Sequence, residues 1–97
     1  MFLIRNVFQA KPGKAKVLVK IMKEAVPFLE PDGFSNIKIM TDIVGDYWTV
    51  VLQSEVESLD IFEKNLRGST SQPAVAEIMK DYMENVIGGH REIFKIE

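Results

Sequence analysis

The polar and aromatic side chains that could carry chemistry are few and well separated in this sequence. Asn6 interrupts an otherwise apolar strand pattern, and a buried amide at this position needs hydrogen-bond partners that a ligand or water can supply. Trp48 is the only tryptophan, and Tyr82 lies on the apolar side of a predicted helix, where its hydroxyl could reach the rim of a pocket. We take Asn6, Trp48 and Tyr82 as candidate ligand-binding residues and assign no catalytic residue.

Each candidate also has a purely structural interpretation. Asn6 could hydrogen-bond to backbone or water between sheet and helices, and this interpretation is favoured. Trp48 shares a predicted strand face with Val50 and Leu52, which favours core packing over a stacking platform. His90 is the only histidine and has no second His or Asp near it in the sequence, which favours a solvent-facing or interface residue over a metal ligand. The sequence predicts neither a metal site nor a cofactor.

The composition is that of one globular domain covering residues 1–97. Hydrophobic residues make up 46% and charged residues 27%, so the chain can bury a core. The absence of cysteine excludes disulfides, thiolate–metal sites and a cysteine nucleophile. The net charge of -2, spread without blocks, argues against nucleic acid or a charged membrane surface as a partner. No apolar run approaches the roughly 18 residues of a membrane span, and no secretory signal opens the chain, so we expect a soluble cytoplasmic protein.

Hydrophobic periodicity predicts the elements that position these side chains. Alternation predicts a strand over residues 2–10 with apolar residues on both faces, which indicates that both faces are covered. Helical spacing begins at Ala15, and this helix should end or kink by about Val26 because Pro27 has no N–H group. Residues 34–43 and 47–54 then predict two antiparallel strands joined by a turn.

The second half predicts a broken helical segment and a final strand. The next helix could start after Ser54 or after Ser58, each of which could cap it, and it should end at Gly68. A polar link over residues 69–72 leads to a second helix whose apolar periodicity runs on to Val86. The Gly-Gly pair after Ile87 should stop this helix, and alternation then predicts a strand at the end of the chain.

The predicted order is β-α-β-β-α-β with the second helical segment split in two, which is a ferredoxin-like α+β fold. Right-handed crossovers place the helices on one face of a four-stranded antiparallel sheet and leave the other face bare. The helix-facing set is expected to contain Ile4, Trp48, Val50 and Phe94. The bare face is expected to hold Leu3, Val7, Met40, Val51 and Ile93.

The bare face predicts a partner. At ~25 cal/mol per Å² of apolar surface, leaving it in water would forgo several kcal/mol, so we expect a second copy of the same sheet to cover it. Val51 should then lie near the core of the dimer, whereas Trp48 should fill the interior of one subunit.

Charged residues on the first and last predicted strands could pair across the sheet or between subunits. Arg5 lies on the first strand, and Arg91 and Glu92 lie on the last. Exposed ion pairs contribute under ~1 kcal/mol, so such pairs would bear on strand register more than on stability.

Three segments resemble the dimeric α/β-barrel superfamily. They are the opening strand running into AKPGKAKVL, the turn, strand and helix of GDYWTVVLQSEVESLDIFEK, and the terminal GHREIFKIE. Within the superfamily, the chain is most similar to small proteins related to the NIPSNAP domain and to the antibiotic-biosynthesis monooxygenases. The resemblance covers nearly the whole chain and implies a homodimer whose two sheets form a barrel, with a pocket between sheet and helices in each subunit. It rests on structural patterns, so it is specific for fold and not for activity.

The same superfamily includes haem-degrading monooxygenases, in which an Asn on the first strand precedes a Gly at the first helix by seven residues. Asn6 and Gly13 match this spacing. The rest of that set, a Trp and a helical His, does not match, because Trp48 lies at the wrong end of its strand and residues 72–86 contain no His. The comparison argues against haem degradation.

Two functions remain open. The first is a non-catalytic or regulatory homodimer that binds a small hydrophobic molecule between sheet and helices. The second, which rests on analogy with the superfamily, is a cofactor-independent monooxygenase or isomerase acting on an aromatic or polyketide-like molecule. In that case Asn6 would orient substrate or oxygen, and Trp48 and Tyr82 would form pocket walls. No nucleophile–base pair or metal constellation in the sequence selects between them.

Overall fold

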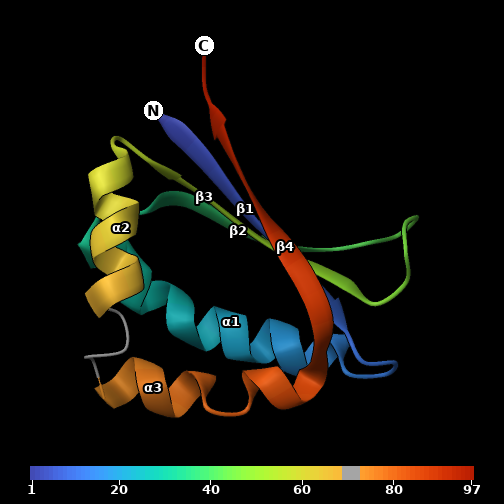
Figure 1. The fold of residues 1–97 in the computed structure, drawn as a ribbon. Helices are drawn as coiled ribbons and strands as arrows, with labels where there is room; N and C mark the ends of the chain where they lie inside the picture. Colours follow the sequence, from blue (N-terminus) through green and yellow to red (C-terminus); the bar gives the residue numbers. More distant parts are fainter. Residues whose placement is uncertain (69–72) are drawn as a thin grey trace.

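The computed structural model describes residues 1–68 and 73–97, and its elements follow the predicted β-α-β-β-α-β order (Figure 1). The predicted link at residues 69–72 lies outside the described residues. The strands are β1 (Phe2–Ala10), β2 (Ser35–Thr41), β3 (Thr49–Val56) and β4 (Val86–Lys95). The helices are α1 (Ala15–Leu29), α2 (Leu59–Gly68) and α3 (Pro73–Met79), with short 3₁₀ helices η1 (Glu30–Asp32) and η3 (Tyr82–Asn85). The ferredoxin-like α+β fold with a split second helical segment is confirmed.

The sheet is antiparallel throughout and has the order β2-β3-β1-β4. In Figure 1 the three helices lie on one side of the sheet, and no described element covers the other side. The two chain ends lie beside each other, and the backbone N–H of Ile96 donates to the carbonyl of Met1 over 3.0 Å. None of the described helices is long and apolar enough to cross a membrane.

The core lies between the sheet and the helices in two clusters. One cluster joins Leu18 and Met22 of α1 to strand residues Ala10 and Val50. The other joins Ile4, Phe34 and Val56. Leu18 and Met22 are four residues apart, so both lie on the face of α1 that packs against the sheet. The burial of Ile4 and Val50 identifies the helix-facing side of the two central strands.

Helix α1 runs on past the predicted stop at Val26 and includes Pro27. The predicted end at Val26 was wrong because Pro27 removes a single backbone hydrogen bond, the one to the carbonyl of Lys23, and both residues are exposed, so water can satisfy that carbonyl. The helix path ends at Gly33, whose φ of 102° favours glycine. A Cβ atom at Gly33 would also lie 3.1 Å from the Ile61 side chain of α2, so this glycine lets α2 approach closely.

The hairpin differs from its prediction in where β3 begins. Tyr47 and Trp48 were expected in this strand, but both have left-handed φ angles, 62° and 54°, which strand pairing does not allow. Strand β3 therefore starts at Thr49 and continues to Val56. Ser54 is buried within β3, so α2 begins after Ser58, which was the second of the two predicted starts.

The last helix is shorter, and the last strand longer, than the periodicity predicted. Helix α3 ends at Met79, and β4 begins at Val86 and includes both glycines that were expected to stop the helix. A Cβ atom at Gly89 would lie 2.2 Å from the carbonyl oxygen of Val7, whereas one at Gly88 would meet no atom within 4 Å. Gly89 therefore permits the close pairing of β4 with β1.

The register of β1 with β4 corrects the predicted faces. Leu3 pairs with Phe94, and Ile4 pairs with Ile93. Cross-strand partners share a face, so Phe94 lies on the bare side and Ile93 on the helix side, the reverse of the prediction. The bare side, which we call the open face, carries the apolar residues Leu3, Val7, Met40, Val51 and Phe94.

Candidate functional site

A pocket lies between the helix-facing side of the sheet and the helices, and we call it the central pocket. Its volume is about 370 Å³, within the range of roughly 300–1,000 Å³ that is typical of ligand pockets. Most of its lining is apolar and comes from β1, β3 and all three α-helices. The larger apolar side chains that line it include Ile4, Phe8, Met22, Leu52, Phe62 and Met79.

A hydrogen-bonded polar pair lines the central pocket. Asn6 of β1 and Arg91 of β4 are cross-strand partners, and Nε of Arg91 donates to Oδ1 of Asn6 over 2.6 Å. The guanidinium carbon of Arg91 lies 5.0 Å from the centroid of the Phe62 ring, a cation–π contact with α2. Asn65 of α2 also lines the pocket, and its buried Nδ2 atom has no hydrogen-bond partner in the described part of the chain.

Tyr82 lines the central pocket together with Asn6. It belongs to η3 and packs edge-on against Phe8 of β1, with ring centroids 6.0 Å apart and an interplanar angle of 79°. Asn85 fixes η3 to the chain around it, because its side chain donates to the carbonyl of Asp81 and its own carbonyl accepts from the backbone N–H of Lys11. The structure therefore brings two of the three candidate residues to one cavity, and their role in binding stays a prediction.

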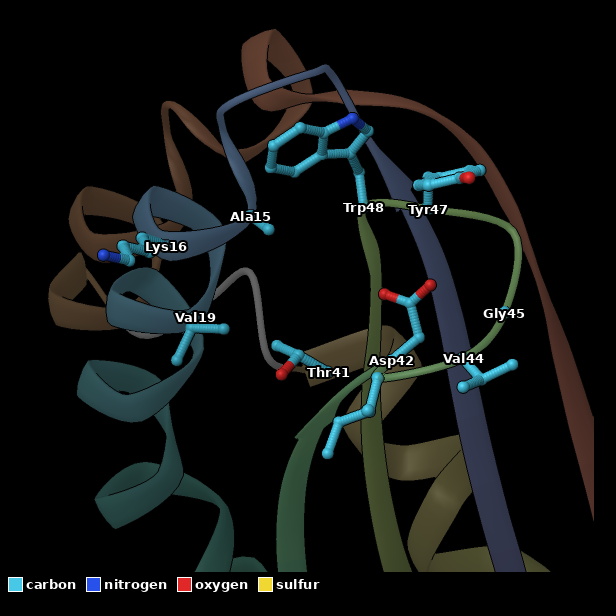
Figure 2. A pocket seen from close by; sticks show the side chains of 10 residues that line it. Ala15, Lys16, Val19, Thr41, Asp42, Val44, Gly45, Tyr47 and Trp48 are labelled. Carbon is cyan, nitrogen blue, oxygen red and sulfur yellow. The ribbon is translucent and has the colours of Figure 1, made fainter.

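Trp48 lies elsewhere. It is 43% exposed in the loop between β2 and β3, so the prediction that it fills the interior was wrong. It lines an open groove of about 790 Å³ between this loop and α1, which we call the loop groove (Figure 2). In Figure 2 the indole extends from the loop toward Ala15 at the start of α1, whereas the Tyr47 ring points away from the helix.

Hydrogen bonds explain the position of Trp48. The side-chain amide of Gln9 donates to the carbonyl of Tyr47, and the backbone N–H of Ala10 donates to the carbonyl of Trp48 over 2.8 Å. At the base of the loop, the backbone N–H of Thr49 donates to Oδ1 of Asp42 over 3.0 Å. These bonds stabilise two consecutive residues in the left-handed conformation. That conformation costs roughly 1–2 kcal/mol of free energy per residue.

The loop presents apolar side chains to the outside. Ile43 is 99% exposed and Val44 is 95% exposed. Of the polar side chains that line the loop groove, Asp42 is already bonded within the loop. Most of the surface that lines the loop groove is apolar. The central pocket combines an apolar wall with the hydrogen-bonded pair Asn6 and Arg91.

A separate charged cluster lies on the open face. The guanidinium of Arg5 bonds to Glu92 over 3.1 Å, which confirms a cross-strand ion pair, and Nε2 of His90 lies 3.4 Å from the same carboxylate. Nε of Arg5 is buried and has no hydrogen-bond partner among the described residues. His90 is an exposed residue on this face, and no group of three metal-ligating side chains occurs in residues 1–68 and 73–97.

Among the described residues, the electrostatic environment shifts the pKa of Lys80. The hydrogen bond to Glu77, followed by the charge of that carboxylate, raises the pKa of Lys80 above its ordinary value. The two side chains are three residues apart on the surface near the end of α3, and neither lines the central pocket or the loop groove. The shift has no bearing on either cavity.

Sequence reasoning missed Arg91, Phe62 and Asn65 as pocket residues. Arg91 was considered only as an ion-pair partner, because its position opposite Asn6 depends on a register between strands 85 residues apart in sequence. Asn65 lies on α2 beside Leu66 and gave no signal of its own, since a single amide on a predicted helix is ordinary. Alternation on the last strand, combined with a correct register, would have found Arg91.

The fold is a ferredoxin-like α+β fold with a largely apolar pocket between sheet and helices. No protein-family model matches the sequence, and no curated protein matches it. Solved structures match over the whole chain. An uncharacterised NIPSNAP domain protein from Burkholderia xenovorans has a TM-score of 0.84 and 11% identity, with 100% of this chain and 95% of that one covered.

Two further solved structures extend the comparison. A NIPSNAP family protein from Agrobacterium tumefaciens has a TM-score of 0.82 and 14% identity, covering 99% of this chain and 92% of that one. A proposed antibiotic biosynthesis monooxygenase from Chloroflexus aurantiacus has a TM-score of 0.77 and 14% identity, covering 99% and 93%. Identities this low establish a shared fold alone, and the fold resemblance predicted from the sequence is confirmed.

Proposed function

We propose that this chain is a homodimeric binding protein that takes a small hydrophobic molecule into the central pocket. The observation that carries the proposal is a largely apolar cavity of about 370 Å³ whose lining includes the hydrogen-bonded pair Asn6 and Arg91. Such a combination is typical of small-molecule sites, in which apolar walls supply affinity and a few polar groups fix orientation. The cytoplasmic location expected from the sequence is part of the same proposal.

The open face supports the homodimer. Phe94 is 49% exposed there, next to Leu3, and Val51 lies between Val7 and Met40 on the same side. A second sheet packed on this face would remove Phe94 and the partly exposed Leu3, Val7 and Met40 from water, at ~25 cal/mol per Å². Val51 is already buried in the single chain, with 9% of its surface exposed. The second sheet could also offer an acceptor to the buried Nε atom of Arg5, which lacks one among residues 1–68 and 73–97.

A thermal-shift screen with small apolar molecules tests ligand binding. A ligand at ten times its Kd stabilises the native state by about 1.4 kcal/mol, which raises the Tm by about 6–11 °C in a domain of this size. Ala76→Trp, at an exposed pocket residue on α3, should obstruct the cavity and remove the shift. Glu77→Trp, at the next residue, does not touch the pocket and serves as the matched control. A screen without any hit contradicts the proposal.

A second candidate function is a cofactor-independent monooxygenase or isomerase acting on an aromatic or polyketide-like molecule. The specific observation in its favour is the hydrogen-bonded Asn6 and Arg91 in the lining of a largely apolar pocket, since such donors could stabilise the enolate oxygen of a bound substrate. Oxygen uptake and product analysis with phenolic and polyketide substrates test it. Turnover that is lost in Asn6→Ala supports catalysis, and the absence of turnover with every substrate argues against it.

A further inference from the structure

Two contacts hold the Arg91 side chain in place where it lines the central pocket. Its Nε atom is bonded to Asn6 of β1, and its guanidinium lies over the Phe62 ring of α2. These contacts come from the sheet and from a helix, so they fix the plane of the guanidinium from two directions. A guanidinium whose plane is fixed in this way can donate two parallel hydrogen bonds to a planar anion.

The charge of Arg91 is not balanced within the described part of the chain. No ion pair between described residues involves Arg91, and the carboxylate of Glu92, its neighbour in sequence, pairs with Arg5 and lies near His90. The nearby Glu92 points to the opposite face of β4, where it is bonded to Arg5. Since the hydrogen bond to Asn6 uses only the Nε donor, the terminal nitrogens of Arg91 are left for another acceptor.

Asn65 adds a buried donor to the same cavity. Its Nδ2 atom is buried and has no hydrogen-bond partner among the described residues. Buried polar groups are paired in almost all native proteins, so an unpaired donor that lines a pocket indicates an acceptor on the ligand. The terminal N–H groups of Arg91 and the Asn65 amide N–H are all donors, and an ionised carboxylate both accepts hydrogen bonds and balances the charge of Arg91.

We infer that the central pocket binds a small carboxylic acid with an apolar body. The carboxylate accepts hydrogen bonds from Arg91 and Asn65, and the hydrocarbon or aromatic part lies against the apolar wall formed by residues such as Leu52 and Phe62. This inference rests on the proposed binding function and narrows its ligand class. It predicts discrimination between an acid and a neutral molecule of the same shape.

Titration calorimetry with matched pairs tests the inference: octanoate against 1-octanol, and 2-naphthoate against 2-naphthylmethanol. The acids should bind at least ~10-fold more tightly than the alcohols, the scale expected of charge-assisted hydrogen bonds. Arg91→Gln should lower the affinity for the acids at least ~10-fold more than that for the alcohols, so that the preference for acids is lost. Lys95→Gln removes a positive charge four residues along the same strand, outside the pocket, and should keep the preference.

Two further measurements make the result independent of the folding of one variant. Arg91→Lys keeps the positive charge but loses the planar guanidinium group, so part of the preference for acids over alcohols should remain. In the unmodified protein, octanoate should shift the NMR signals of the Arg91 Nε–H and the Asn65 side-chain amide, whereas 1-octanol should not. Equal affinity for acids and alcohols overturns the inference while the proposed binding function stands. Failure of both acids and alcohols to bind overturns the inference, and the wider screen then decides the binding function separately.

Discussion

Nε of Arg91 donates a hydrogen bond of 2.6 Å to Oδ1 of Asn6, across the pairing of β4 with β1. The bond joins an amide on an otherwise apolar strand face to a cation near the opposite end of the chain. It gives Asn6 a side-chain partner within the chain, where the structural interpretation had expected backbone or water. It also orients Arg91, so the same bond supports a role for both residues at the pocket.

Asn6→Asp should separate the contribution of this hydrogen bond to stability from its contribution to ligand binding by Arg91. The new carboxylate would pair with Arg91 and neutralise it, so the affinity for octanoate should fall by about 10-fold while that for 1-octanol stays the same. Because Arg91 is exposed, the new ion pair should change the free energy of unfolding by less than ~1 kcal/mol. Calorimetric titration and urea unfolding measure the two effects. A variant that binds octanoate as tightly as the unmodified protein would contradict the role given to Arg91.

The sequence predicted the elements better than it predicted their exact pairing. Strand β1 has its predicted bounds, because its run of apolar and β-forming residues ends just before Pro12 and Gly13. The faces of β4 were reversed, because Ile93 and Phe94 are both apolar and alternation alone does not say which of them pairs with Leu3. Long-range register decides that point, and it also decides that Arg91 lies opposite Asn6.

Local backbone geometry accounts for the main error at the candidate site. Trp48 is followed by Val50 and Leu52 at strand spacing, so pattern alone placed it in the strand and the core. The carbonyl groups of Tyr47 and Trp48 instead bond to Gln9 and Ala10, and both residues are left-handed. Neither residue type favours that conformation, so tertiary hydrogen bonds overrode the propensity.

Phe94→Asp should disrupt the proposed homodimer. The side chain lies half exposed on the open face, so a charge there costs little in one subunit but would be buried unpaired between two sheets. Light scattering coupled to size exclusion should show a dimer for the unmodified protein and a mass near 11.0 kDa for the variant. Leu59→Asp, at a residue of α2 with similar exposure, should stay dimeric. A monomer in the unmodified protein at micromolar concentration would rule out the proposed assembly.

Gly89→Ala should destabilise the fold far more than Gly88→Ala. The new methyl group at residue 89 would lie 2.2 Å from the carbonyl oxygen of Val7, so β1 and β4 would have to move apart. Overpacking of this kind costs roughly 1–3 kcal/mol or more. At Gly88 the methyl group meets no atom within 4 Å, so that variant should lie within ~0.5 kcal/mol of the unmodified protein. Chemical denaturation compares the two, and equal stabilities would show that the strand pairing yields without cost.

Trp48→Ala should cost much less stability than a substitution in the core. The indole is 43% exposed beside α1, so its loss should reduce the free energy of unfolding by about 1 kcal/mol. Leu18→Ala, at a fully buried position, should cost roughly 2–5 kcal/mol. Because Trp48 is the only tryptophan, acrylamide should quench the fluorescence of the native protein efficiently. Weak quenching in the dimer together with efficient quenching in the Phe94→Asp monomer would mean that the loop between β2 and β3 is covered by the partner, which would extend the subunit interface beyond the open face.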